Sequence, residues 1–145
     1  MIAIIASFIA ALSFAITISA PKSEWMLIGT VAAIAWFIKI IVLNVFHVSQ
    51  SLALLIASAS IAVCSIFLAK KRRNPPSVYN IPAVFPLVPG ITAFQTMEAF
   101  MNQSFYLGLE LLLRTIRYAL SIAFGIVFIE LLHRSFKKLQ ARKSL

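Results

Sequence analysis

Five apolar stretches of about twenty residues each dominate this 145-residue chain, and short polar segments separate them. A helix needs about 20 apolar residues to cross the roughly 30 Å hydrocarbon core of a bilayer, because it rises about 1.5 Å per residue. Hydrophobic residues make up 61% of the chain and charged residues only 12%, about half the charged fraction of an average soluble domain. The pattern therefore predicts an all-α integral membrane protein with about five transmembrane helices.

The predicted helices and a basic tail together form a single transmembrane domain over residues 1–145. The helices cover residues 2–20, 25–44, 49–69, 81–101 and 105–133, and the tail covers residues 134–145. The first stretch resembles a signal peptide in length, but no Lys or Arg precedes it and Pro21 would directly follow the cleavage site. We therefore expect this stretch to be retained as the first helix.

Residue sets that carry enzyme chemistry are not visible in the sequence. The lone Cys64 has no second cysteine with which to form a disulfide, and no group of His, Cys or acidic residues has metal-ligand spacing. No nucleophile–base pattern and no Gly-rich phosphate loop accompanies the many Ser and Thr residues. We therefore expect no enzymatic activity, no metal and no cofactor.

The fourth apolar stretch contains Pro82, Pro86, Pro89 and Gly90, which a continuous helix does not tolerate. We predict a broken or kinked crossing with irregular backbone near residues 86–90, where Gly90 takes a positive φ or lets another helix approach closely. Irregular backbone at membrane depth is tolerated only where it is buried in protein or lines a water-filled cavity.

Two interpretations fit this interruption, and the sequence leaves both open. A half-helix starting after Gly90 would direct free N–H groups and its positive dipole end at a ligand, which favours a carboxylate. Alternatively, the break is a structural kink whose backbone groups are satisfied by neighbouring helices. In the first interpretation, the substrate-binding residues are Pro86, Pro89, Gly90, Thr92, Gln95 and Thr96.

Most of the 13 Lys and Arg residues lie in two clusters, at residues 70–73 and in the tail. Cytoplasmic segments of membrane proteins carry the excess of Lys and Arg. Five crossings place both clusters and Lys22 on one side, whereas four crossings would separate the clusters. We therefore predict an outside N-terminus and a cytoplasmic C-terminus. We attribute the net charge of +9 to this orientation rather than to nucleic-acid binding.

Several charged residues lie inside the apolar stretches or near their ends, where ionisable groups are costly and often functional. Lys39 either reaches the outer interface with its long side chain or pairs with an anion. Glu98 lies at a matching depth, as a partner for Lys39 or as a proton-coupling acid. Glu110, Arg114 and Arg117 share a helix face, which indicates either an ion-paired boundary or subunit contact, or a charged patch at an exit route.

The segment 76–97 resembles the threonine/serine exporter family. Pro86, Pro89, Gly90 and Thr92 match the family pattern of a proline, a short apolar stretch, a Pro-hydrophobic-hydrophobic-Pro-Gly run and a hydroxyl-rich tail. The chain is similar to the C-terminal membrane half of these exporters, which also exists as a separate small subunit.

The resemblance implies a secondary exporter of small hydrophilic carboxylates, either threonine and serine or a dicarboxylate such as succinate. It also implies a bacterial inner-membrane location and a second membrane subunit, similar to the N-terminal half of the family, in a hetero-oligomer. A non-transporting scaffold or assembly protein and a small channel subunit are the alternative functions that the sequence allows.

The five-crossing topology is testable by cysteine labelling in a Cys64→Ala background. We expect cysteines placed at residues 87–91 to be protected from a bulky impermeant maleimide, because that segment lies at membrane depth. Tags at Arg73 and Leu145 should report the same, cytoplasmic side. Free labelling of residues 87–91 from the cytoplasm, with Leu145 across the membrane from Arg73, would contradict the topology.

Overall fold

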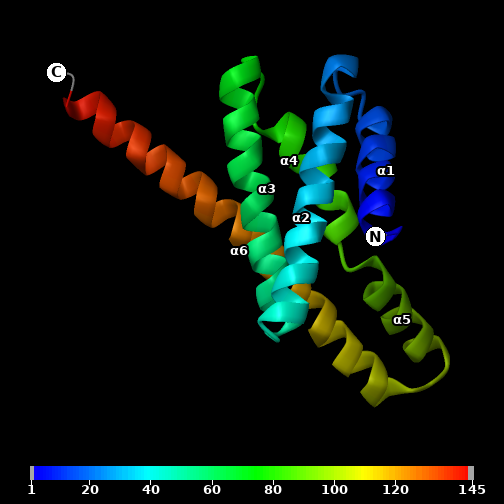
Figure 1. Cartoon of the computed structure of the whole chain (residues 1–145). Helices are drawn as coiled ribbons and strands as arrows, with labels where there is room; N and C mark the ends of the chain where they lie inside the picture. Colours follow the sequence, from blue (N-terminus) through cyan, green and yellow to red (C-terminus); the bar gives the residue numbers. More distant parts are fainter. Residues whose placement is uncertain (1, 144–145) are drawn as a thin grey trace.

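The structure, a computed structural model, describes residues 2–143 and, within them, all side chains except those of residues 136 and 138–143. Helices make up the described secondary structure, and the prediction of an all-α protein is confirmed. Figure 1 shows α1, α2 and α3 side by side, α6 crossing α3, and α5 folded against the first half of α6. The elements are α1 (Ile2–Thr17), η1 (Lys22–Glu24), α2 (Trp25–Val45), α3 (Gln50–Arg72), α4 (Ser77–Val84), η2 (Phe85–Leu87), α5 (Gly90–Met101) and α6 (Phe105–Lys143).

The fourth apolar stretch is broken, as predicted. Its first part ends at Leu87, its second part begins at Gly90, and the two parts are bent by 49°. Three helical segments are long and apolar enough to cross a membrane, and the bent pair would be a fourth span. These segments are Lys22–Val45, Gln50–Arg72 and Phe105–Ser135, and the bent pair is Ser77–Leu87 with Gly90–Met101. The chain is thus a multi-pass membrane protein by its helix composition.

The first helix is shorter than predicted, because a tight turn closes it before Pro21. The N–H of Ala20 donates to the carbonyl of Ala15 at 2.9 Å, and the N–H of Ser19 donates to the carbonyl of Ile16 at 3.0 Å. Ser19 has a φ of 57°, so this is the left-handed helix ending that satisfies the last carbonyls of a helix. α1 is therefore apolar but only 16 residues long.

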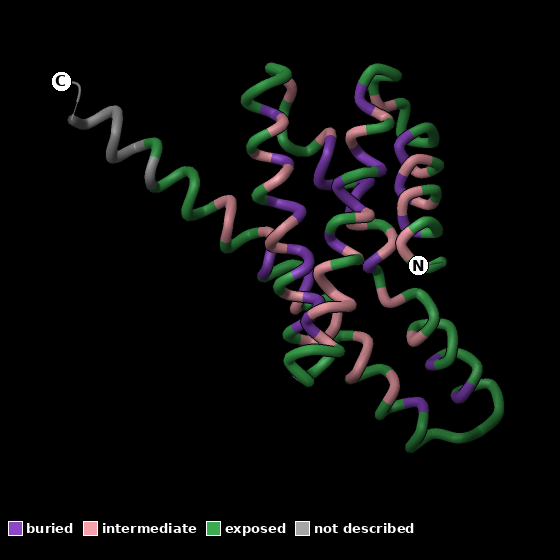
Figure 2. The backbone as a smooth tube through the Cα atoms, viewed as in Figure 1, coloured by how far each residue is buried: buried purple, intermediate pink, exposed green. Residues whose placement is uncertain are grey.

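Small residues form the centre of the bundle. Buried alanines occur in pairs on each of the first three helices, and buried positions gather where α1 to α4 meet in Figure 2. Without a hydrophobic driving force between helices in lipid, close backbone packing through small side chains holds such bundles together. The paired alanines are Ala11 and Ala15 on α1, Ala32 and Ala35 on α2, and Ala53 and Ala57 on α3.

Gly125 lies at the closest approach of α6 to α3. A Cβ atom at this position would meet Ser58 Oγ and lie 2.5 Å from the backbone oxygen of Leu55. Backbone atoms cannot move aside without separating the two helices. The crossing of α3 and α6 therefore depends on the missing side chain.

We expect Gly125→Ala to destabilise the protein by about 1–3 kcal/mol, the usual cost of overpacking. Thermal unfolding in detergent, followed by circular dichroism, measures this change. Gly90→Ala is the matched control, because a Cβ at Gly90 has nothing within 4 Å. Equal unfolding temperatures for both variants would contradict the close crossing of α3 and α6.

Candidate functional site

The break in the fourth stretch is an inverse γ-turn centred on Pro89. Pro89 has φ −76° and ψ 55°, and the N–H of Gly90 donates to the carbonyl of Val88 at 2.8 Å. Gly90 does not have a positive φ, and no other helix approaches within 4 Å of its Cβ position, so both expectations about its backbone were wrong. The direction of the chain changes at Pro89, whose ring fixes φ and whose nitrogen has no hydrogen to donate.

α5 begins directly after this turn. Its first intrahelical hydrogen bond runs from the N–H of Ala93 to the carbonyl of Pro89 at 3.1 Å. The N–H groups of Ile91 and Thr92 precede that bond, and no described side chain caps them. The Thr92 hydroxyl donates to the carbonyl of Pro89 at 3.0 Å. The start of α5 therefore presents backbone donors, which is the local geometry that the first of the two interpretations requires.

A cavity of about 160 Å³ lies against the break and collects side chains from four helices. Five of the predicted site residues line it together: Pro86, Pro89, Gly90, Thr92 and Lys39. Three residues that sequence reasoning missed complete its polar and aromatic wall, namely Trp36, Gln50 and Tyr118. The irregular backbone thus lines a cavity, which is one of the two settings in which it is tolerated at membrane depth.

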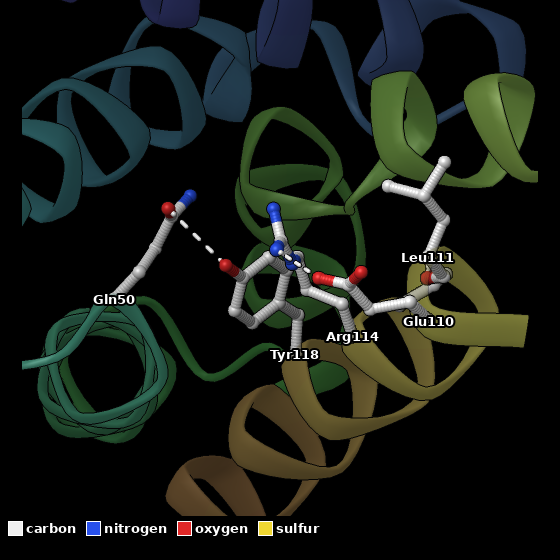
Figure 3. A network of polar contacts seen from close by, with 6 residues as sticks. Gln50, Glu110, Leu111, Arg114 and Tyr118 are labelled. Atoms are coloured by element: carbon white, nitrogen blue, oxygen red, sulfur yellow. Dashed lines mark hydrogen bonds and ion pairs between the residues drawn. The ribbon is translucent and has the colours of Figure 1, made fainter. Parts of the chain in front are cut away.

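Lys39 is the cation of this cavity. Its ammonium lies 4.0 Å from the ring centroid of Trp36, one helical turn earlier on α2, in a cation–π contact. Across the cavity, the Tyr118 hydroxyl donates to Gln50 Oε1 at 3.4 Å, which joins α6 to the start of α3 (Figure 3). The spacing of Trp36 and Lys39 on one helix face was a signal available in the sequence.

The remaining residues predicted on the fourth stretch lie beyond the bend. Gln95 and Glu98 line a second cavity of about 400 Å³ between α5 and α6. Thr96 is buried, and its hydroxyl donates to the carbonyl of Thr92 at 2.7 Å, within its own helix. Lys39 and Glu98 line different cavities and form no ion pair, because the bend directs α5 away from α2 and toward α6.

Glu110 and Arg114 form an ion pair of 2.9 Å along one face of α6, and Arg114 lies beside Tyr118 in Figure 3. It is the only ion pair among the side chains that the structure describes. The side chains are 65% and 42% exposed, respectively. Arg117, one turn further along α6, is also exposed. These three charges lie on the surface of the chain rather than inside either cavity.

Two hydrogen bonds, one buried and one partly buried, anchor α4, and sequence reasoning missed both. The Tyr79 hydroxyl donates at 2.7 Å to Glu24, a carboxylate that is only 3% exposed and also accepts from the Ser23 hydroxyl at 3.1 Å. The neighbouring Asn80 donates to Glu130 of α6 at 2.9 Å. Glu130 therefore bonds to α4 and forms no ion pair with Arg134, although the spacing of four residues on one helix would allow such a pair.

The geometry is that of a class of membrane proteins. Apolar helices of membrane-spanning length surround a proline-broken helix whose half-helix start lines a small, mostly apolar cavity with a few polar groups, an arrangement that occurs in membrane transporters. Residues 3–132 match the family described as "Threonine/Serine exporter, ThrE", and the chain belongs to this family. No curated protein and no solved structure matches the chain significantly.

The anchor of α4 is testable through Tyr79. Tyr79→Phe leaves the Glu24 carboxylate buried without its main donor, and we expect a loss of stability of about 1–3 kcal/mol. Thermal unfolding in detergent measures this loss. Tyr106→Phe removes the same hydroxyl from a residue that is 89% exposed and should have no effect. An unchanged unfolding temperature for Tyr79→Phe would show that the Glu24 contact does not hold α4.

Proposed function

We propose that this chain is the small subunit of a secondary exporter of small hydrophilic carboxylates, and that the substrate carboxylate binds in the cavity at Pro86–Gly90. Membership of the threonine/serine exporter family supports amino-acid export. Threonine and serine are the first candidate substrates, and a dicarboxylate such as succinate is the second. The observation that carries the proposal is the meeting of Lys39 with the start of α5 in one cavity.

The chemistry of the cavity suits a small amphipathic anion. The Lys39 ammonium and the N–H groups of Ile91 and Thr92 are donors for a carboxylate, and the start of α5 adds a positive dipole end. Gln50 and Tyr118 supply polar groups for the rest of the substrate. A volume of about 160 Å³ is below the range of about 300–1,000 Å³ for drug-sized ligands, which favours a small metabolite.

A second membrane subunit is part of the proposal, and the surface of α6 supports it. In the apolar span of α6 only 11% of residues are buried, against 44% in the span of α3. The exposed Glu110 and Arg117 and the partly exposed Arg114 lie on this span, where contact with lipid would be costly. A partner similar to the N-terminal half of the family would cover this face and complete the transport path.

We base the orientation and the energy coupling on the sequence. We propose a bacterial inner-membrane location with the N-terminus outside and the C-terminus in the cytoplasm, based on the basic clusters. Glu98 remains the proposed proton-coupling acid, because it lines the second cavity beside Gln95 and is open to solvent there.

The function is tested by efflux from cells that carry this gene together with a gene for the partner subunit. Cells preloaded with labelled threonine, serine or succinate should export at least one of them faster than cells that lack either gene. Saturation with substrate and sensitivity to a protonophore distinguish a secondary exporter from a channel. Equal efflux with and without the two genes, for all three substrates, would overturn the proposal.

The cavity itself is tested by Lys39→Met, which removes the cation but keeps a side chain of similar length. We expect the substrate concentration for half-maximal efflux to rise about tenfold or more, because hydrogen bonds to charged groups contribute about 1.5–3 kcal/mol. Lys22→Met is the matched control, since Lys22 is exposed and lies outside this cavity. Identical efflux for both variants would remove Lys39 from the site.

Gly90→Leu tests the same cavity by occupying it. The Cβ position of Gly90 is open, so a larger side chain should enter the cavity and abolish efflux while the protein folds and inserts normally. Efflux and the amount of folded protein in the membrane fraction are measured together. Normal efflux from a folded Gly90→Leu protein would place the substrate elsewhere.

A further inference from the structure

Two adjoining cavities lie at the opposite end of α3 from the break, where α3 and α6 diverge (Figure 1). Their volumes are about 230 and 540 Å³, and they share Ile66, Pro76 and His133 in their walls. The larger one is within the size range of ligand sites. We call the two together the basic wedge.

The charge of the basic wedge is strongly one-sided. Lys70 of α3 and Arg134 and Lys137 of α6 line it, and His133 lines both cavities. The one acid in the wall is Glu130, whose carboxylate accepts the hydrogen bond from Asn80. Among the described side chains the three cations have no carboxylate within ion-pair distance. The basic wedge therefore holds several positive charges that no described carboxylate neutralises.

The position of the basic wedge indicates what neutralises it. Lys70 lies in the last turn of α3, which ends at Arg72, and Arg134 and Lys137 follow directly after the apolar part of the α6 sequence. The ends of membrane spans lie at the level of the lipid phosphates. Ile66 and Ala69 continue the wall toward the apolar part of α3. A ligand with a negative headgroup and an apolar tail would contact the cations with its headgroup and the apolar side chains with its tail.

We propose that the basic wedge binds the phosphodiester headgroup of an acidic phospholipid, with the acyl chains lying along α3 and α6. Basic pockets between transmembrane helices suit such headgroups, and each Lys or Arg near the surface contributes about 1 kcal/mol. The apolar wall favours a lipid over free phosphate, because free phosphate would contact only the cations and leave the apolar side chains uncovered. This inference does not depend on the substrate or on the direction of transport.

Native mass spectrometry of the purified full chain, titrated with phosphatidylglycerol, tests this site. Phosphatidylcholine with the same acyl chains and free glycerol phosphate are the two comparison ligands. We expect phosphatidylglycerol to bind at least tenfold more tightly than either one. In the variant Lys70→Gln, Arg134→Gln and Lys137→Gln, its affinity should fall roughly a hundredfold.

The control variant removes three charges from the same end of the protein but outside the wedge. It carries Lys22→Gln, Lys71→Gln and Arg73→Asn, the last chosen because Asn tolerates the left-handed backbone of residue 73. It should keep the wild-type affinity within about threefold. Lys137→Gln alone, at an exposed side chain, should lower the affinity about fivefold and keeps the test decisive if the triple variant does not fold.

Three results would overturn the proposal. Equal binding of phosphatidylglycerol and phosphatidylcholine would show that the negative headgroup is not recognised. Binding of glycerol phosphate as tight as that of phosphatidylglycerol would identify the wedge as a site for a free anion. An equal loss of affinity in the control variant and the wedge variant would show that only the overall charge matters.

Discussion

The backbone at Pro89 is the constraint on which the rest of the molecule depends. A peptide chain in an apolar environment must pair its N–H and C=O groups, and a proline pair in mid-span prevents a helix from doing so. The inverse γ-turn solves part of this problem locally, since Gly90 bonds back to Val88. The donors of Ile91 and Thr92 remain at the start of α5, beside a cavity lined by Lys39.

The helices around the break are arranged so that this irregular segment keeps its place. α4 is held on one side by Glu24 through Tyr79 and on the other by Glu130 through Asn80. Both bonds connect α4 to elements distant in sequence, and both involve buried residues of α4. Hydrogen bonds to other elements therefore fix the break at its α4 end, whereas α5 beyond the bend packs mainly on α6.

The proline break and the helical class could be predicted from sequence because their causes are local. Proline lacks a donor wherever it stands, and an apolar stretch of membrane-spanning length has few other uses. Gln50 and Tyr118 could not be predicted as neighbours of Lys39, because only tertiary packing decides which helix faces meet. Glu24 had the position of an ordinary interfacial charge, and its partner Tyr79 lies in another helix. Glu98 and Lys39 matched in depth, but the 49° bend places them apart.

Gly90 differs from the other glycines of the chain because a side chain added there does not have to disturb helix packing. At Gly29, Gly108 and Gly125 an added Cβ would come within 3 Å of packed atoms, so folding itself restricts those positions. At Gly90 folding imposes no such restriction, because an added Cβ meets nothing within 4 Å. A graded series of side chains at this single position would thus vary the space beside the proposed substrate cavity without forcing the helices apart.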